Sequence, residues 1–409
     1  MAEYLFSNFG LLDADAGKLK SGYQVLVRDN VIEQVEKGVI RAPRAETVDC
    51  RGRVLMPGLI DCHNHATTQV LAGPPTMLPS LNTAHALSTL GKMVLRGFTT
   101  FRDCAGADLG HKMAIEKGLF PGPRLFVSGR ALSQTGGHAD PRVRAEQRSL
   151  INCCVHLEGG LGRVADGVAE VRQAVRDEIR LGADQIKLMA SGGIASASDP
   201  IDQVQYSQEE LRAAVDEAER SNTYCMAHCY PDSSIRHCVE AGVRTIEHGS
   251  FLTEETAKMM ARAGAYLVPT LIGFRLLGRF GAKLGYNPEQ MEKTAYVLSA
   301  GTKALVSAKA AGVKMAYGTD IGYFHDYQSE EFLVRAEVLS PAEIIRSATI
   351  VGAEVVRMVG KLGVVAPGAF ADLLVVDGDP FKDLGLFQGQ GKHLSLIMAN
   401  GRLIKNRLN

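Results

Sequence analysis

The sequence places two histidines, His63 and His65, one residue apart at the end of the apolar segment 55–62. Residues i and i+2 of a strand point to the same side, so both imidazoles can reach one cation. Further residues that can bind or bridge metals lie in or directly after other short apolar segments: Lys187, His228, His248 and Asp320. Neutral imidazoles grouped in this way suit a borderline metal such as zinc.

The number of these residues, with Lys187 among them, indicates how many cations the set can hold. Four histidines, one carboxylate and one lysine are too many for a single tetrahedral zinc site, and they suit two cations that share a bridging group and a hydroxide. A free ammonium has no lone pair for a metal. A lysine that has reacted with carbon dioxide carries a carbamate, which can bridge two metals as a carboxylate does. The alternative is a lysine that pairs with a nearby acid, or one whose pKa is lowered by burial.

Each histidine, taken alone, can also be an ordinary core residue, so the metal interpretation depends on the whole set. The remaining histidines have no comparable placement, and we expect most of them on the surface: His85, His111, His156, His237, His325 and His393.

The elements that must position these residues form a repeated pattern. Short apolar segments alternate with helical patterns from residue 55 onward, which is typical of β-α units and a parallel sheet. The expected strands are 55–62, 98–103, 124–128, 185–190, 224–228, 245–248, 266–270 and 314–318. Eight such units predict an α/β fold, a (β/α)8 barrel of the TIM type, whose active site lies at the C-terminal ends of its strands.

Several connecting segments have patterns of their own. Segments 168–181 and 207–221 are expected helices, and the second opens with a capping box of Ser207 and Glu210. A further helix is expected at 342–359. Segment 134–167 is long, polar and poor in helical patterns, which is typical of an active-site loop.

Both ends of the chain are rich in strand patterns and turns. Hairpin turns are expected at Asp29-Asn30 and at Asn400-Gly401. We therefore predict a small β-sandwich domain built from residues 1–56 and 361–409, with the barrel, residues 57–360, inserted between them.

The composition excludes several classes of partner. Lys and Arg together number 45, as do Asp and Glu, so the formal charge gives no reason to expect nucleic acid or an anionic membrane. No apolar run approaches the ~20 residues that span a bilayer, and the first residues lack the pattern of a secretory signal. The eight cysteines are scattered, with Cys153 next to Cys154, which indicates reduced thiols in a cytoplasmic protein.

Taken together, these motifs resemble those of the amidohydrolase superfamily of metal-dependent hydrolases, over essentially the whole chain. The motifs that carry the resemblance are 57–65, 186–187, 227–228, 246–249, 318–320 and 363–373. The resemblance implies two zinc ions, or other divalent cations, with these ligands: His63, His65 and Asp320 for one, His228 and His248 for the other, and Lys187 carboxylated by CO2 as the bridge. It also implies that Asp320 is the general base that takes a proton from the bridging hydroxide.

A closer resemblance is to Xaa-Pro dipeptidases (prolidases) and related carboxypeptidases, carried by segments 99–103, 136–140 and 186–193. In similar enzymes, the histidine of a Gly-Gly-His motif and a tyrosine two residues after the strand-five histidine hold the substrate's terminal carboxylate. Those positions here are His138 and Tyr230, and both side chains can donate to a carboxylate. Ala139 departs from the glycine of many relatives. We therefore expect a homo-oligomeric hydrolase that cleaves Xaa-Pro dipeptides or N-acyl-proline with a hydroxide bridging two zinc ions.

Other substrates and other classes of protein remain open. A carboxypeptidase or dipeptidase for C-terminal Arg or Lys would need an acid in its pocket, for which Asp140, Asp199 and Asp202 are candidates. An N-acyl amino acid deacylase or a lactonase would keep the same metal site. A deaminase would usually hold one metal and lack the strand-four lysine. A non-catalytic scaffold would have lost a ligand, and none is missing here.

Overall fold

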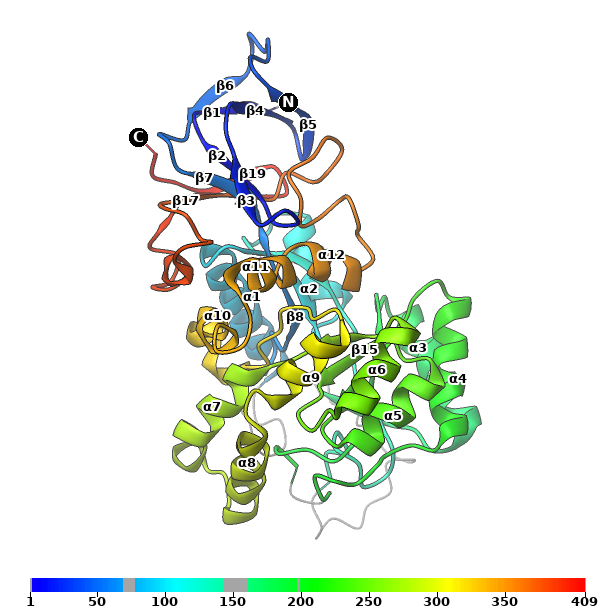
Figure 1. The fold of residues 1–409 in the computed structure, drawn as a ribbon. Helices are drawn as coiled ribbons and strands as arrows, with labels where there is room; N and C mark the ends of the chain where they lie inside the picture. Colours follow the sequence, from blue (N-terminus) through cyan, green and yellow to red (C-terminus); the bar gives the residue numbers. More distant parts are fainter. Residues whose placement is uncertain (1, 69–77, 143–160, 197–198, 409) are drawn as a thin grey trace.

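The computed structural model describes residues 2–68, 78–142, 161–196 and 199–408. Figure 1 shows a β-rich part that holds both chain termini and, next to it, a larger part in which strands alternate with helices. Cys153, Cys154, His156 and part of the predicted loop 134–167 lie outside the described residues.

The larger part contains two parallel sheets, with strand orders β10-β9-β8 and β12-β11-β13-β14-β15-β16. Their bounds are β8 (Leu59–Asn64), β9 (Phe98–Asp103), β10 (Arg124–Phe126), β11 (Ala131–Ser133), β12 (Gly162–Val164), β13 (Ile186–Met189), β14 (Cys225–Cys229), β15 (Thr245–His248) and β16 (Tyr266–Val268). Every residue of β8, β9, β13, β14 and β15 is buried. Such strands have near-continuous apolar sequences because both faces are covered, which is why the sequence revealed them.

Backbone hydrogen bonds join the two parallel sheets on both sides. The N–H of Asp184 donates to the carbonyl of Val127 (2.7 Å), just after β10. On the other side, the N–H of Leu267 in β16 donates to Lys314 (3.0 Å), and the N–H of Cys62 in β8 donates to Tyr317 (2.8 Å). Segment 314–318, the expected eighth strand, forms only an isolated bridge at Met315. The α/β architecture is therefore TIM-like.

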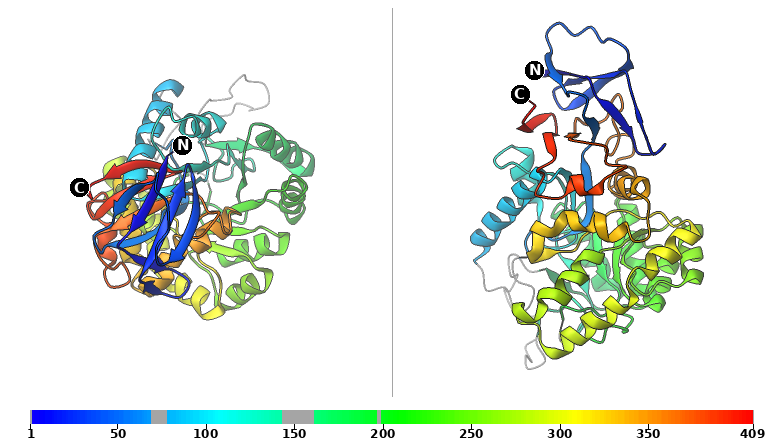
Figure 2. Two further views of the ribbon diagram at one scale, coloured as in Figure 1. Left: turned by 90° about the horizontal axis from the view of Figure 1, so that it is seen from above. Right: turned by 60° about the vertical axis from the view of Figure 1, so that its left-hand side comes forward.

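Helices cover the outside of these strands, as the view from above in Figure 2 shows. The α-helices are α1 (Pro79–Leu95), α2 (Leu109–Glu116), α3 (Gly167–Arg180), α4 (Gln208–Arg220), α5 (Asp232–Ala241), α6 (Glu254–Ala263), α7 (Leu271–Phe280), α8 (Pro288–Ala300), α9 (Lys303–Ala311), α10 (Glu331–Arg335), α11 (Pro341–Ser347) and α12 (Ile350–Val355). The 3-10 helices are η2 (Gly281–Leu284), η3 (Gly322–Glu330) and η4 (Leu384–Phe387).

Two of the three predicted helices are confirmed, and one prediction is wrong. In α4 the side chain of Ser207 accepts from the N–H of Glu210, and Glu210 returns a bond to Ser207, as the capping box requires. The expected helix 342–359 is instead two short helices, α11 and α12. The carbonyls of Ser347 and Ala348 accept bonds from Tyr317 and Ile60, so the barrel strands take the groups that a continuous helix would use.

The two chain ends build two further sheets, with strand orders β5-β4-β1-β6 and β19-β18-β17-β7-β2-β3. Their bounds are β1 (Glu3–Ser7), β2 (Gly10–Asp13), β3 (Lys18–Lys20), β4 (Tyr23–Arg28), β5 (Val31–Lys37), β6 (Glu46–Asp49), β7 (Val54–Pro57), β17 (Leu373–Val376), β18 (Leu394–Ala399) and β19 (Arg402–Asn406). Both predicted hairpins, β4-β5 and β18-β19, are confirmed. The expected strand 55–62 is divided: β7 pairs with β17 in this part, while β8 enters the parallel sheet. The domain boundaries stay a prediction.

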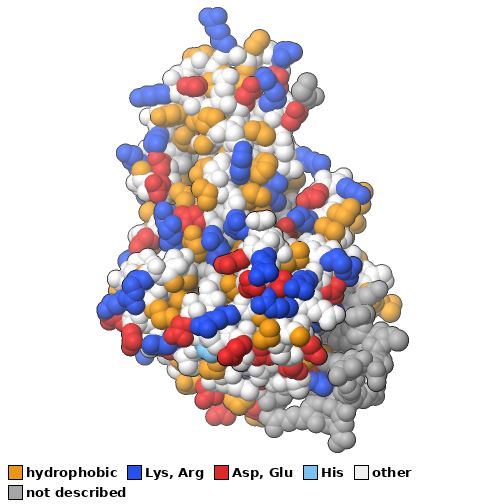
Figure 3. All heavy atoms as spheres, turned by 90° about the vertical axis from the view of Figure 1, so that its right-hand side faces the viewer, with side chains coloured by type: hydrophobic (Ala, Val, Ile, Leu, Met, Phe, Trp, Pro, Cys, Tyr) orange, Lys and Arg blue, Asp and Glu red, His pale blue; other side chains and the backbone are white. Residues whose placement is uncertain are grey.

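The surface is mixed in charge. On the face shown in Figure 3, Lys and Arg side chains are interspersed with Asp and Glu, in keeping with a formal net charge of zero. Among the described residues, no helix is both long and apolar enough to cross a membrane.

Candidate metal centre

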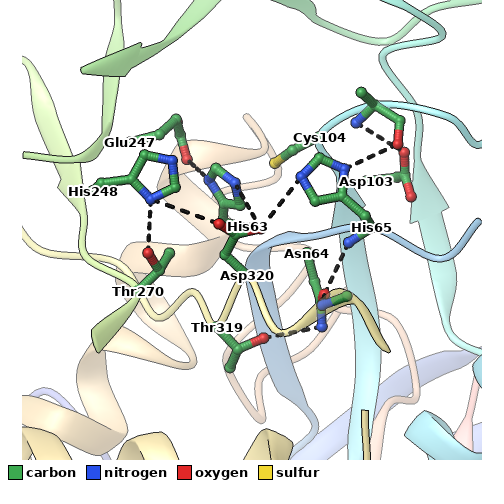
Figure 4. Close-up of polar contacts among 12 residues, drawn as sticks. His63, Asn64, His65, Asp103, Cys104, Glu247, His248, Thr270, Thr319 and Asp320 are labelled. Carbon is green, nitrogen blue, oxygen red and sulfur yellow. Dashed lines mark hydrogen bonds and ion pairs between the residues drawn. The ribbon is translucent and has the colours of Figure 1, made fainter. Parts of the chain in front are cut away.

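His63, His65 and Asp320 lie together at the C-terminal end of β8 (Figure 4). Nε2 of His63 is 3.7 Å from Oδ1 of Asp320, and Nε2 of His65 is 3.4 Å from the same oxygen. The backbone N–H groups of Thr319 and Asp320 both donate to the carbonyl of His63 (2.9 and 2.8 Å). A Cβ added at Gly318 would lie 2.9 Å from Cβ of His63. The glycine therefore lets the segment that carries Asp320 approach the strand that carries the histidines.

His63 and His65 are each held through ring nitrogen Nδ1, and Nε2 of both rings faces Asp320. Nδ1 of His63 lies 2.5 Å from Oε2 of Glu247, and Nδ1 of His65 lies 3.0 Å from the carbonyl of Ala105. Nε2 of His63 is buried and has no hydrogen-bond partner among the described residues. A buried polar atom without a partner is costly, and a cation beside Asp320 would satisfy it.

His228 and His248 lie beside this group. The ring centroids of His63 and His248 are 4.7 Å apart, as are those of His228 and His248. Nε2 of His228 lies 3.2 Å from the carbonyl of Gly192, and Nδ1 of His248 lies 2.7 Å from Oγ1 of Thr270. Each ring thus has one nitrogen held by an oxygen and one left over, the arrangement expected of ligands whose orientation is fixed by neighbours.

Lys187 lies in β13 with 1% of its surface exposed. It forms no ion pair with any carboxylate of the described residues, which disfavours the pairing alternative. Burial first, and also the charge of Lys187, hold the pKa values of His63, His228 and His248 well below the usual 6.5. The three imidazoles are therefore neutral, the form that binds metals.

The carboxylate of Asp320 stays ionised. Burial works to raise its pKa, but a hydrogen bond from His65 and the nearby charges lower it overall. Burial likewise works to lower the pKa of His65, and Asp320 raises it overall. Neutral imidazoles, a carboxylate and a buried ring nitrogen without a partner fit a divalent cation.

Two of these residues have unusual backbone conformations. His248 has φ +67° and Asp320 has φ +46°, in the left-handed region that residues other than glycine rarely adopt. Such conformations gather at functional sites, where the surrounding structure holds them in place.

A second layer of buried polar residues supports the cluster, and none of its members was predicted to have a role there. Asp61 accepts bonds from Oγ1 of Thr319 (2.7 Å) and Nε2 of Gln328 (2.8 Å). Burial raises the pKa of Asp61 to about 6. Arg102 and Glu247 form a fully buried ion pair next to His63. Their signal in the sequence was a charged residue inside an otherwise apolar strand.

His138 and Tyr230, the expected carboxylate-binding pair, both contact the ring of His228. The ring of His138 stacks on that of His228 with centroids 4.4 Å apart, and the ring of Tyr230 meets it edge-on at 4.6 Å. A side chain at Gly193 would collide with the imidazole of His138, so the Ser191-Gly192-Gly193 motif makes room for that ring. Burial raises the pKa of Tyr230 well above its usual value, which keeps the phenol protonated and able to donate.

The three acids that could select a basic substrate are engaged or exposed. Asp140 pairs with Arg142, with Nε of Arg142 2.9 Å from Oδ1. Oδ2 of Asp199 accepts from the N–H of Gly193 (3.0 Å) and lies 3.5 Å from Nδ1 of His138. Asp202 is exposed.

Two histidines expected on the surface are buried. His111 is 7% exposed and completes the N-terminal cap of α2 with Asp108. His325, in η3, is also 7% exposed, and neither ring nitrogen has a hydrogen-bond partner in the part of the chain that the structure describes. Burial lowers its pKa to about 3. These positions depend on packing between distant segments, which a single sequence does not reveal.

The chain is similar to known proteins over most of its length. A model of the Amidohydrolase family matches residues 54–404. An ochratoxinase from Aspergillus niger is 33% identical over 366 residues, which cover 86% of this chain and 76% of that protein. A crystal structure of an amidohydrolase is 50% identical, with a TM-score of 0.97 and 100% of both chains covered. A crystal structure of a prolidase complexed with N-methylphosphonate-L-proline is 44% identical, with a TM-score of 0.95, covering 99% of this chain and 100% of that one.

Proposed function

The chain belongs to the amidohydrolase family, and on that premise we propose that it is a binuclear metal dipeptidase that cleaves Xaa-Pro dipeptides. We assign one divalent cation, zinc in the first instance, to His63, His65 and Asp320. We assign a second to His228 and His248, with carboxylated Lys187 between the two. When bound, such cations supply an acidified water molecule and polarise the scissile carbonyl.

Asp320 is the residue best placed to move protons. Its carboxylate is ionised, partly exposed, and directed between His63 and His65. A carboxylate there can accept a proton as the amide is attacked and deliver it to the leaving nitrogen. In an Xaa-Pro substrate that nitrogen belongs to the proline ring, so it must gain a proton to leave as a neutral amine.

The observation that carries the dipeptidase proposal is the position of His138 and Tyr230 against His228. Both side chains can donate hydrogen bonds. Their ring centroids lie 4.4 and 4.6 Å from that of His228, a proposed metal ligand. A terminal carboxylate held there would place the adjacent amide bond next to the cations. Binding of a non-reacting part of the substrate orients the reacting part.

The surroundings of Tyr230 favour an apolar C-terminal residue. Phe274 of α7 lies 5.6 Å from Tyr230 and 5.8 Å from His248, measured between ring centroids. Tyr230 and Phe274 pack in one apolar cluster with Ile194, Ile201, Tyr286 and Val297. Proline suits such a wall, whereas Arg or Lys would need a free acid. The relative solved with N-methylphosphonate-L-proline supports the same choice.

A substrate screen tests the proposal. Zinc-loaded protein is assayed against a dipeptide library varied at both positions, together with N-acyl amino acids and lactones. We expect the highest kcat/KM for Xaa-Pro. Faster cleavage of Xaa-Arg or Xaa-Lys would favour the carboxypeptidase alternative, and faster cleavage of N-acyl amino acids or lactones would favour a deacylase or lactonase. Metal-loaded protein that hydrolyses none of these compounds would contradict the proposal. A cytoplasmic location and a homo-oligomeric state also stay proposals.

A further inference from the structure

A buried chain of polar groups runs behind His63, away from Asp320. Nδ1 of His63 lies 2.5 Å from Oε2 of Glu247, and Nη2 of Arg102 donates to Oε1 and Oε2 of Glu247 at 2.8 and 2.9 Å. Oγ1 of Thr245 also donates to Oε1 of Glu247 (2.5 Å). The four residues come from three strands, β8, β9 and β15, so these hydrogen bonds cross the interior of the fold.

The carboxylate of Glu247 is held in one orientation. Glu247 and Arg102 are both 0% exposed, and Arg102 is itself fixed by bonds to the carbonyl of Cys62 (2.5 Å) and to Oγ1 of Thr245 (3.1 Å). Burial works to lower the pKa of Arg102, but the nearby Glu247 raises the pKa of Arg102 well above its usual value. Both oxygens of Glu247 accept hydrogen bonds from the guanidinium of Arg102, as the oxygens of a carboxylate do, and a carboxylate has no proton to donate. The proton in its contact with His63 therefore comes from Nδ1.

That requirement decides which tautomer His63 adopts. A neutral imidazole carries one proton, and if Nδ1 holds it, Nε2 presents its lone pair. Nε2 of His63 is the buried atom without a partner that faces Oδ1 of Asp320. We propose that Glu247, clamped by Arg102, is a positioning residue that fixes the tautomer of His63 and so prepares Nε2 for the metal. This inference rests on the metal site of the proposed function.

Glu247 differs from the groups that hold the other histidines. His65 and His228 meet backbone carbonyls, and His248 meets the hydroxyl of Thr270. Among these four histidines, only His63 meets a carboxylate other than that of Asp320. A charged acceptor makes a stronger hydrogen bond than a neutral one and raises the basicity of the ligand. The cation bound by His63 and His65 should therefore depend on Glu247 more than the other cation does.

A purely structural ion pair makes a different prediction. Replacing a buried ion pair by apolar groups of similar volume is often neutral for stability, while removing one partner alone is strongly destabilising. Two matched double variants therefore separate the roles: Arg102→Met with Glu247→Leu, and Arg102→Met with Glu247→Gln. Both remove both charges. Only the second keeps an oxygen that can accept from Nδ1 of His63, with its amide nitrogen turned toward Thr245.

The test compares metal affinity, measured by competition with a chromophoric chelator, in the wild-type holoenzyme and both double variants. We expect the double variant with Glu247→Leu to bind one of the two cations about 10- to 100-fold more weakly than wild type. The double variant with Glu247→Gln should lose less affinity. Equal affinities in all three proteins, or equal losses in both variants, would overturn the inference. Circular dichroism and thermal unfolding of the metal-free proteins check that the variants fold.

A second measurement needs no charge-pair variant. Nitrogen-15 spectra of metal-free wild-type protein, with His63 assigned through His63→Gln, should show the Nδ1–H tautomer; the Nε2–H tautomer would refute the inference even if the double variants do not fold. Failure of the proposed function has a different signature, namely a wild type that binds two cations and cleaves no dipeptide.

Discussion

Removing the hydroxyl of Tyr230 is the most direct test of the proposed carboxylate clamp, by which we mean His138 and Tyr230 holding the terminal carboxylate of the substrate. Tyr230 is 3% exposed, and its ring packs against His228, His248 and Phe274 with centroids 4.6, 5.2 and 5.6 Å away. Tyr230→Phe keeps those ring contacts and deletes one donor. A buried partner left without its hydrogen bond costs about 1–3 kcal/mol. We therefore predict that kcat/KM for an Xaa-Pro dipeptide falls about 5- to 150-fold.

The assay compares two enzymes, each on two substrates. Wild type and Tyr230→Phe are each measured with Ala-Pro and with its C-terminal amide. Amidation removes the charge that the clamp binds, so it should abolish most of kcat/KM in the wild type and matter less in the variant. Tyr206→Phe is the matched control. Tyr206 is also buried, and its hydroxyl has no hydrogen-bond partner among the residues that the structure describes. It lies outside the proposed site, so kcat/KM should stay within experimental error of wild type.

Equal losses for the free and the amidated substrate would refute the clamp, because the hydroxyl would then act on something other than the carboxylate. Wild-type cleavage of the amide at the rate of the free acid would refute it too. A loss in Tyr206→Phe of the same size would mean that any buried phenol affects turnover through folding alone.

Three further predictions concern the metals, the proton and the pH dependence of stability. Elemental analysis should find close to two divalent cations per chain, and far fewer in Lys187→Ala; a single cation, unchanged in the variant, would refute the binuclear site. Asp320→Asn should lower kcat far more than it raises KM, since it removes an interaction specific to the transition state, and near-normal turnover would exclude this role. His325 has a pKa of about 3 in the fold against 6.5 in the unfolded chain, so below about pH 6.5 the unfolded state binds more protons and stability falls as pH falls. In His325→Gln the free energy of unfolding, measured with urea from pH 7 to 5, should fall less steeply than in wild type; equal slopes would show that His325 is not buried in its neutral form.

Much of the fold was readable from local patterns. The strands Phe98–Asp103 and Thr245–His248 have the predicted bounds, because buried parallel strands are short apolar runs bounded by turns. The capping box of Ser207 and Glu210 is formed as predicted, since its residues lie three positions apart and depend on nothing distant. The same applies to the hairpin at Asn400-Gly401, where the turn residues accept positive φ.

The sequence also determined which residues could form the cluster, because ligand-type side chains at the ends of parallel strands share one edge of the sheet. The structure places His63, His65, His228, His248 and Asp320 side by side. Their roles as ligands, and those of Lys187, His138 and Tyr230, stay predictions for the experiments above.

Tertiary structure alone decided how that cluster is supported. Glu247 meets His63 across 184 positions of sequence, and Arg102 meets Glu247 across 145. A charged residue in an apolar strand marks Arg102 and Glu247, but nothing local shows which partner each one meets, since a contact between strands depends on how the sheets close. The break between α11 and α12 has the same origin, because distant strands take the carbonyls of Ser347 and Ala348. Local patterns therefore determined where the chemical groups stand along the chain, and packing between distant segments determined their hydrogen bonds, tautomers and charges.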